Sequence, residues 1–332
     1  MSTEAKSFLT SYHNYDDILV WMKELVLAHS DIATLVEVGK TYEGRTIYGI
    51  AKMHTPNTPD SESTAPLGFI FHGAQHAREW ISAAVSIYLL DSLVATLSSE
   101  TMPETVADLA LTKFEWTVIP VMNVDGYIYT WEKDRMWRKN RQPNPSSSFF
   151  PCVGTDTNRN WDYRWNTGGS SRNPCSEAYL GPSPFSSQEP KAIADYVLSR
   201  KKAGVDVKVY IDFHAYSQLW MSPWGYTCSD DTVDENRQVA AAQKAVKALA
   251  EVNGKRFAAG PICRTIYPAS GSSTDWVYGT ANVTYSYGVE LRDTGAHGFV
   301  LPASEILPSG KEMWAAVTAL AEFVAKDANV VQ

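Results

Sequence analysis

The sequence predicts an α/β fold in which layers of helices cover a largely buried β-sheet. Five segments repeat apolar residues with a period near 3.6, which indicates amphipathic helices. Six short, mostly apolar runs are typical of strands that are covered on both faces. These helices and strands alternate along the chain, as they do in a layered α/β sandwich. We expect residues 1–332 to form a single domain, because the sequence contains no linker, internal repeat or low-complexity tail.

The predicted elements follow in chain order. They are a helix at 15–29, strands at 34–41, 46–53 and 67–71, a helix at 79–97, a strand at 114–122, a helix at 187–202, a strand at 207–213, a helix at 233–254, a strand at 284–291 and a helix at 310–327. Pro190 near the start of one helix and Gly254 at the end of another are where helix ends favour these residues. From about Asn123 to Ser187 the helical pattern stops, and so long an irregular region is more often functional than idle.

Charge and apolar content argue against two classes of partner. The net charge of −8 disfavours nucleic acid, because contacts with phosphates dominate that kind of affinity, and the locally basic stretch is limited to 132–142. The apolar run at 81–97 is short and interrupted by Asp91, so we do not expect it to span a bilayer. We therefore expect a soluble protein without nucleic-acid or membrane partners.

The N-terminus and the cysteines leave the compartment open. Residues 1–17 lack the basic and apolar regions of a secretory signal, which indicates either the cytoplasm or a chain whose leader has been left off. The four cysteines include no CxxC pair, which argues against a zinc ribbon or a thioredoxin-type site. They could pair in three ways or remain four buried thiols.

One pair of residues predicts a metal site. In "HGAQHAREW", His76 and Glu79 stand where a predicted strand passes into a predicted helix, and both side-chain types bind zinc. His214 follows a buried strand in the same way, and ligands in open α/β sheets gather beyond the carboxyl ends of strands. Three such ligands leave one coordination position for water. The alternative for each histidine is a buried, hydrogen-bonded ring.

A water at such a site needs a general base, and Glu290 is the acidic residue buried in an apolar strand-like run. A buried carboxylate is costly without a cationic partner or a function, so the alternative is an ion pair with Arg292. Guanidinium groups grip carboxylates bidentately, and the irregular region contains several, together with an asparagine. These residues are Arg135, Arg138, Arg141, Asn158 and Arg159. Together the groups suit hydrolysis of an amide that lies beside a free carboxylate.

The ordered motifs resemble a known family, the zinc metallocarboxypeptidases related to pancreatic carboxypeptidases A and B. The resemblance runs from about Tyr12 to Phe323. It rests on "QHAREW", "MWRKNR", "CVGTDTNRNWD", "PCSEAYLGPSPFSSQE", "HAYSQLWMSPWGY", "TIYPASGSSTDW" and "VELRDTGAHGFVLPASEI". So many motifs in family order make coincidence implausible.

The resemblance implies a role for each matched residue. It implies one Zn²⁺ held by His76, Glu79 and His214, whose bound water is activated by Glu290. Arg141 would stabilise the oxyanion together with the zinc. The substrate's terminal carboxylate would be held by Asn158, Arg159 and Tyr267, with Tyr267 on a mobile loop. The outer substrate cleft would be lined by Arg78, Arg138, Tyr216 and Phe299.

The resemblance also implies the architecture and the setting of the protein. It implies a mixed, mainly eight-stranded sheet between layers of helices, and disulfides joining Cys152 to Cys175 and Cys228 to Cys263. Two disulfides indicate an oxidising compartment, so we expect a secreted monomer that starts at the mature enzyme. Its partners would be peptide and protein C-termini, proteinaceous carboxypeptidase inhibitors and a cleaved pro-segment.

In this family the base of the pocket for the C-terminal side chain is acidic for Lys and Arg and apolar for aromatic and aliphatic residues. The matching residue here is Thr274, which is neither, and Asp275 matches an aspartate that both branches share. A basic side chain would lose its hydration in this pocket without gaining a partner. The remaining wall would be Met221, Gly225, Ile262, Ile266, Ala269, Ser272 and Gly288. We therefore expect a preference for aromatic or bulky aliphatic C-terminal residues.

Two other classes of function remain open. A non-catalytic binding module on the same fold would have no need for ligands, base and clamp together. A zinc amidohydrolase with another substrate would be expected to lack the carboxylate clamp. Metal analysis separates the first class from an enzyme, and an amidated peptide tests the second.

Overall fold

A mixed eight-stranded sheet forms the centre of the part of the chain that the structure describes, with the strand order β1-β2-β4-β3-β5-β8-β6-β7. The structure is a computed structural model that describes residues 8–53, 66–99, 105–144 and 152–331. The strands are β1 (Thr34–Lys40), β2 (Thr46–Met53), β3 (Leu67–His72), β4 (Phe114–Ile119), β5 (Asp206–Ala215), β6 (Leu219–Ser222), β7 (Ala258–Pro261) and β8 (Tyr285–Leu291). This confirms the predicted α/β class and the mixed sheet.

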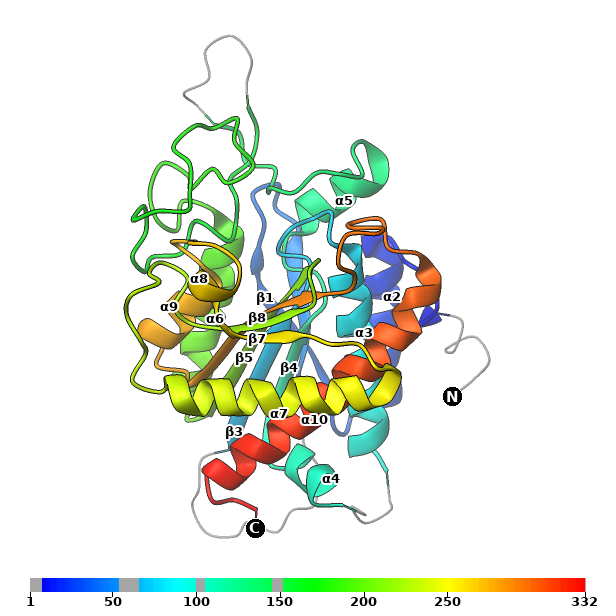
Figure 1. Cartoon of the computed structure of the whole chain (residues 1–332). Helices are drawn as coiled ribbons and strands as arrows, with labels where there is room; N and C mark the ends of the chain where they lie inside the picture. Colours follow the sequence, from blue (N-terminus) through cyan, green and yellow to red (C-terminus); the bar gives the residue numbers. More distant parts are fainter. Residues whose placement is uncertain (1–7, 54–65, 100–104, 145–151, 332) are drawn as a thin grey trace.

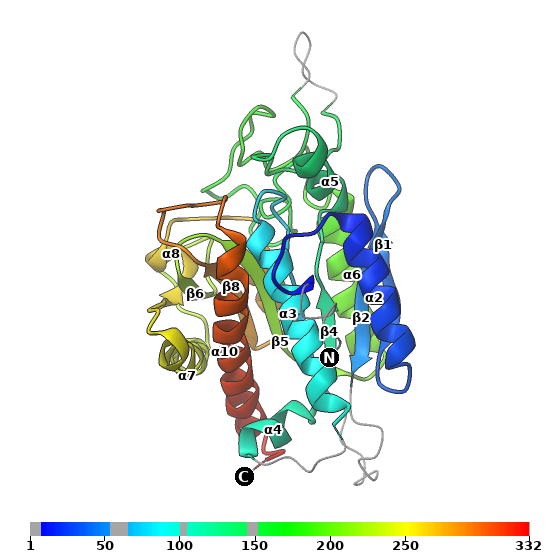
Figure 2. The ribbon, with the colours of Figure 1, turned by 90° about the vertical axis from the view of Figure 1, so that its right-hand side faces the viewer.

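Helices lie on both sides of the sheet, as Figure 1 shows. They are α2 (Tyr15–Ala28), α3 (Trp80–Leu97), α4 (Val106–Leu111), α5 (Val124–Glu132), α6 (Gln188–Lys202), α7 (Glu235–Asn253), α8 (Ile262–Thr265), α9 (Ser273–Gly279) and α10 (Ile306–Asp327), with a 3₁₀ turn at Ala303–Glu305. Helices α6 and α9 lie on one side of the sheet, and α2, α3 and α10 lie on the other (Figures 1 and 2). The sandwich of three layers is the predicted arrangement.

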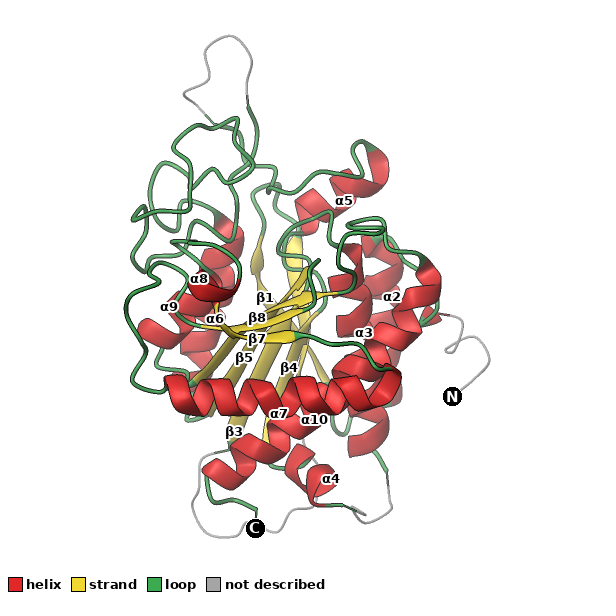
Figure 3. Ribbon diagram, viewed as in Figure 1, coloured by secondary structure: helices red, strands yellow, loops and turns green. Residues whose placement is uncertain are grey.

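Four neighbouring strands, β4, β3, β5 and β8, run parallel to one another. Strand β2 pairs antiparallel with β1 and β4, and β6 pairs antiparallel with β8 but parallel with β7. Every residue of β3 and β4 is buried, which explains why both strands read as continuous apolar runs. The carboxyl ends of β3, β5 and β8 open at one edge, where ligands of open α/β sheets bind. Figure 3 shows loop segments gathered over this end.

All five predicted helices and all six predicted strands are present, with shifts at their ends. The last helix begins at Ile306 rather than 310, because Pro308 lies within its first turn, where the ring costs no hydrogen bond. Gly254 adopts a left-handed conformation (φ 73°) directly after α7, as expected for a C-terminal cap. Helix α3 is long and apolar enough to cross a membrane by length and composition, but 72% of it is buried inside the protein, as in a core helix.

The irregular region predicted from about Asn123 to Ser187 is wrong for its first part, because helix α5 begins at Val124 and runs to Glu132. The Asn123 side chain caps the helix by accepting a hydrogen bond from the Gly126 N–H. Five further elements were not predicted from the sequence, and each has four to seven residues: β6, β7, α4, α8 and α9. Segments so short do not complete enough of a period to be recognised.

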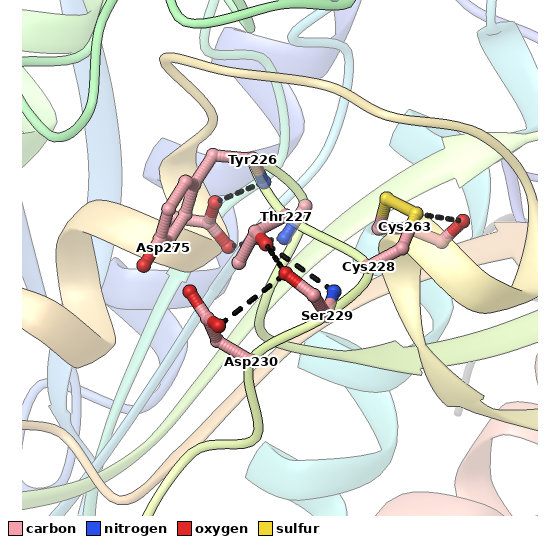
Figure 4. Close-up of a disulfide and its surroundings, with 8 residues drawn as sticks. Tyr226, Thr227, Cys228, Ser229, Asp230, Cys263 and Asp275 are labelled. Atoms are coloured by element: carbon pink, nitrogen blue, oxygen red, sulfur yellow. Dashed lines mark hydrogen bonds between the residues drawn. A yellow bond between two sulfur atoms is a disulfide. The ribbon is translucent and has the colours of Figure 1, made fainter.

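The two disulfides join Cys152 to Cys175 and Cys228 to Cys263, as the family resemblance implied. The first lies within the long irregular region. The second ties the segment after β6 to the start of α8, and Figure 4 shows it beside Tyr226 and Asp275. Both bridges therefore fasten loops near the open edge of the sheet rather than the sheet itself.

Candidate metal centre and substrate site

His76, Glu79 and His214 form one buried cluster in which the ligand atoms lie within 4.8 Å of one another. His76 lies in the turn after β3, Glu79 directly precedes α3, and His214 is on β5. His76 Nδ1 is 2.9 Å from Glu79 Oε1, and His214 Nδ1 is 3.0 Å from Glu79 Oε2. The two Nδ1 atoms are 3.0 Å apart. Three donor atoms from three separate elements therefore face one shared point.

The other nitrogen of each imidazole contacts a carboxylate. His76 Nε2 is 3.0 Å from Asp156 Oδ1, and His214 Nε2 is 2.8 Å from Asp212 Oδ2. Because a carboxylate accepts hydrogen bonds, we assign the proton of each ring to Nε2, which leaves a lone pair on each Nδ1. Two lone pairs and a carboxylate so close together repel one another unless a cation lies among them. This donor set fits Zn²⁺, which takes imidazole and carboxylate ligands.

Glu290 is on β8, beside His214 in the register of the parallel pair of β5 and β8. Part of the residue remains exposed, but its Oε2 atom is buried and has no hydrogen-bond partner among the described residues. Burial raises the pKa of Glu290 to about 8, although the charge of His214 opposes this rise. Arg292 instead donates to Glu312 at 2.8 Å and contacts Glu305. The alternative ion pair between Glu290 and Arg292 is therefore wrong.

Arg138 faces the metal cluster. Its Nε and Nη2 atoms donate to Asp156 Oδ2 at 3.2 and 2.8 Å, and its Nη1 is 3.8 Å from Glu79 Oε1. Its positive charge also lowers the pKa of Glu290, against the larger effect of burial. The Asp156 carboxylate thus orients both His76 and Arg138, one through each oxygen.

The described contacts of Arg141 are with two aromatic rings and not with the metal ligands. Its guanidinium carbon lies 3.6 Å from the centre of the Tyr129 ring and 4.4 Å from that of the Trp137 ring. It lines an open cavity of about 320 Å³ together with both cysteines of the first disulfide. The structure therefore brings Arg138, rather than Arg141, to the metal ligands.

Asn158 and Arg159 lie beside the metal cluster. Asn158 Nδ2 is 3.0 Å from His214 Nε2, and its Oδ1 accepts a hydrogen bond from the Ser273 N–H. Arg159 is 6% exposed, and its Nε and Nη1 atoms donate to the carbonyls of Gly169 and Asn158. No carboxylate in the described part of the chain forms an ion pair with it. A buried guanidinium held only by carbonyls is suited to an anionic ligand.

The remaining predicted contacts form an outer group. Tyr267 is 48% exposed, and its ring centre is 6.0 Å from the Arg159 guanidinium. The Arg78 guanidinium lies 4.2 Å from the centre of the Phe299 ring, and the Phe299 and Tyr216 rings are 5.0 Å apart. The structure thus brings Arg78, Tyr216 and Phe299 together and places Tyr267 beside the buried arginine.

A family model described as zinc carboxypeptidase matches residues 18–316. The chain belongs to the zinc carboxypeptidase family. It is a metallocarboxypeptidase, and its zinc site consists of His76, Glu79 and His214. Peptides are its substrates.

Relatives named as A-type and as B-type carboxypeptidases are both similar to this metallocarboxypeptidase. It is 41% identical to the metallocarboxypeptidase A-like protein of Trichophyton verrucosum over 314 residues, which cover 95% of this chain and 70% of the relative. It is 40% identical to carboxypeptidase B of Astacus astacus over 315 residues, which cover 95% of this chain and 97% of the relative. Because names of both types occur at similar identity, the side-chain preference needs a separate argument.

Solved structures show the same fold. Bovine thrombin-activatable fibrinolysis inhibitor, in complex with tick carboxypeptidase inhibitor, matches with a TM-score of 0.85 and 33% identity, over 96% of this chain and 99% of that protein. Carboxypeptidase A of Helicoverpa armigera matches with a TM-score of 0.84 and 26% identity, over 97% of this chain and 75% of that protein.

Three of the residues predicted to line the side-chain pocket lie together. Thr274 is buried, and a Cβ atom at Gly288 would meet its Oγ1 at 3.4 Å. Gly288 is also the cross-strand partner of Met221, so these three residues adjoin. Burial raises the pKa of Asp275 to about 7, and its two oxygens accept hydrogen bonds from the backbone N–H groups of Gly225 and Tyr226 at 2.8 and 2.9 Å (Figure 4).

Sequence reasoning missed the two carboxylates behind the histidines, Asp156 and Asp212. A signal for Asp212 was present, because residues two apart on a strand point to the same face, and Asp212 stands two before His214. Asp156 lies in an irregular segment, and its contact with His76 spans 80 positions of sequence. Periodicity therefore could not have revealed it.

Proposed function

We propose that this metallocarboxypeptidase removes aromatic or bulky aliphatic residues from the C-termini of peptides and proteins. The observation that carries this proposal is the pairing of Thr274 with Asp275 at the pocket. Thr274 offers a hydroxyl where a basic side chain would need a charge, and both oxygens of Asp275 are already engaged by backbone N–H groups. A Lys or Arg side chain would lose its hydration here without a free carboxylate.

Substrate binding begins with the terminal carboxylate. Arg159 presents a buried guanidinium without an anionic partner among the described residues, and Asn158 presents an amide beside it. Tyr267, which is half exposed, covers the bound C-terminus. This clamp fixes the scissile bond at the metal cluster, and fixed geometry lowers the entropic part of the barrier.

His76, Glu79 and His214 would hold Zn²⁺, and the bound ion would supply a Lewis acid able to polarise a carbonyl and to lower the pKa of water. Glu290 accepts a proton from the attacking water and transfers it to the leaving amine. Arg138 donates a hydrogen bond to the carbonyl oxygen as negative charge develops on it, a role for which its position beside Glu79 suits it. We therefore assign to Arg138 the role that we had expected for Arg141.

A preference for Lys and Arg is the competing specificity. Its support is the 40% identity to a carboxypeptidase named B and the Asp275 carboxyl group, which would lie 3.5 Å from a Cβ atom at Gly225. We favour the apolar preference, because Asp275 would have to give up its backbone hydrogen bonds to face the pocket.

The test uses peptides that differ only in the last residue, which is Phe, Leu or Arg, and an amidated copy of the Phe peptide. We expect kcat/KM to be far higher for Phe and Leu than for Arg, and very low for the amidated peptide. Equal values for Arg and Phe would overturn the side-chain preference. Efficient cleavage of the amidated peptide would overturn the carboxylate clamp.

We also propose a setting for the enzyme. The two disulfides are typical of secreted proteins, so we propose that it acts outside the cell as a single-domain monomer. The homologous bovine structure contains a tick carboxypeptidase inhibitor, so proteinaceous inhibitors are the proposed protein partners, and a cleaved pro-segment is a further partner proposed from the family resemblance alone. The mass of the purified protein in solution tests whether it is a monomer, and fractionation of its natural source tests whether it is secreted.

A further inference from the structure

The carboxylate of Asp212 lies directly behind a zinc ligand. Asp212 is on β5, its side chain is completely buried, and its Oδ2 is 2.8 Å from His214 Nε2. The same oxygen accepts hydrogen bonds from Gln75 Nε2 at 2.9 Å and from Ser273 Oγ at 2.6 Å. Three donors from a loop, a strand and a helix therefore converge on one oxygen.

We propose that Asp212 is a positioning residue that fixes the tautomer and the orientation of His214 for zinc binding. Two groups face Nε2 of His214, the Asp212 carboxylate at 2.8 Å and the Asn158 amide nitrogen at 3.0 Å. Because the carboxylate is charged and closer, it keeps the ring proton on Nε2, so the lone pair of Nδ1 faces Glu79 and His76. A carboxylate also makes the imidazole a stronger ligand than a neutral acceptor would. The substrate preference proposed above plays no part in this argument.

Asp156 provides an internal comparison. It lies 3.0 Å from Nε2 of His76 in the same way that Asp212 lies beside His214. The two histidine ligands come from different elements, and so do the two carboxylates, yet both rings are held by the same kind of contact. Each histidine ligand therefore has its own buried carboxylate.

The other oxygen of Asp212 faces His72. His72 is completely buried at the end of β3, and its Nδ1 is 3.5 Å from Asp212 Oδ1. Neither atom has a hydrogen-bond partner among the described residues. His72 Nε2 lies 2.5 Å from the Tyr210 hydroxyl on the other side. The ring of His72 therefore blocks one side of the carboxylate, which cannot rotate away from His214 without displacing it.

A purely structural role is the alternative, because Asp212 also joins β5 to the loop of Gln75 and to α9 through Ser273. The test must therefore measure zinc binding separately from folding. Asp125 supplies a matched control, since it is also a buried carboxylate that accepts several hydrogen bonds, from Thr41, the Glu43 N–H and Arg45.

The experiment compares Asp212→Asn with Asp125→Asn. The metal-free proteins are titrated with zinc against a chromophoric chelator, and their melting temperatures are recorded without zinc. We expect Asp212→Asn to weaken zinc binding by about 10- to 100-fold, the usual effect of losing such an outer partner. Asp125→Asn should stay within about threefold of the parent. A folded Asp212→Asn protein with parental zinc affinity, or equal losses in both variants, would overturn the proposal.

A second measurement needs no variant. In the zinc-loaded parent protein with ¹⁵N-labelled histidine, nuclear magnetic resonance reports which ring nitrogen carries a proton. We expect two metal-bound rings protonated at Nε2, both with downfield, slowly exchanging protons that are hydrogen-bonded to carboxylates. A metal-bound ring protonated at Nδ1, or only one such protected proton, would contradict the proposed role of Asp212 even if the Asn variant does not fold.

Discussion

His214 and Glu290 are register partners on the neighbouring parallel strands β5 and β8. Because side chains at paired positions of parallel strands point to the same side of the sheet, this pairing places a zinc ligand and a buried carboxylate next to each other. Parallel strands also end at the same edge, so both residues lie where the loops supply Asn158 and Arg159. The register of one strand pair thus positions the metal and the general base together.

The first prediction concerns Glu290→Gln. The amide has nearly the same size but cannot accept a proton, so we expect kcat to fall by about 10²- to 10⁴-fold while zinc content stays at one per chain. Steady-state kinetics and metal analysis of the same preparation test this. If activity remains within tenfold of the parent, another group must serve as the base.

The pH profile gives a second prediction. Burial raises the pKa of Glu290 to about 8 in the metal-free chain, and a nearby cation favours the ionised form, so zinc should lower this pKa. The base must be ionised, so kcat/KM should rise with pH on a limb that lies below pH 8 in the zinc enzyme. A profile of kcat/KM from pH 5 to 9 tests this. A limb centred above pH 8, or one that survives in Glu290→Gln, would exclude Glu290 as its source.

The third prediction separates two arginines. Arg138→Lys keeps a positive charge but loses the planar fork, so we expect kcat to fall by about 10²- to 10³-fold with little change in KM. Arg141→Lys, which alters a guanidinium stacked on Tyr129 and Trp137, should stay within about threefold. Kinetics on one peptide test both variants. Equal losses in kcat would return a catalytic role to Arg141.

These two arginines also show what the sequence could and could not predict. His76, Glu79 and His214 were predictable, because each stands at the end of a buried strand or the start of a helix. The carboxyl ends of parallel strands share one edge of the sheet, so residues at these positions are expected to lie together. Arg138 and Arg141 stand three apart in an irregular segment, where spacing carries no information on direction. The same limit hid Asp156, whereas Asp212 was overlooked although the two-residue period of β5 indicated its face.

The second disulfide provides a fourth prediction. Cys228 and Cys263, which stand 35 positions apart, are joined two residues after Tyr226, whose N–H donates to Asp275 (Figure 4). We expect Cys228→Ser with Cys263→Ser to lower the free energy of unfolding by about 2 to 5 kcal/mol and to raise KM, because the pocket wall loses an anchor. Denaturant unfolding and kinetics measure the two effects. Loss of stability with an unchanged KM would show that the bridge does not support the pocket.

The last prediction tests the base of the side-chain pocket. Thr274 is buried and adjoins Gly288, and we expect a carboxylate at this position to face the bound side chain. Thr274→Asp should raise kcat/KM for C-terminal Arg, because the new carboxylate pairs with the substrate's guanidinium. It should lower kcat/KM for C-terminal Phe, because the same carboxylate must lose its hydration beside the substrate's aromatic ring. Thr274→Val is the matched control: it has the same shape without the hydroxyl, so activity on Phe should be kept and activity on Arg should stay low. If Thr274→Asp leaves the ratio of the two activities unchanged, residue 274 does not face the C-terminal side chain, and specificity is set elsewhere in the pocket.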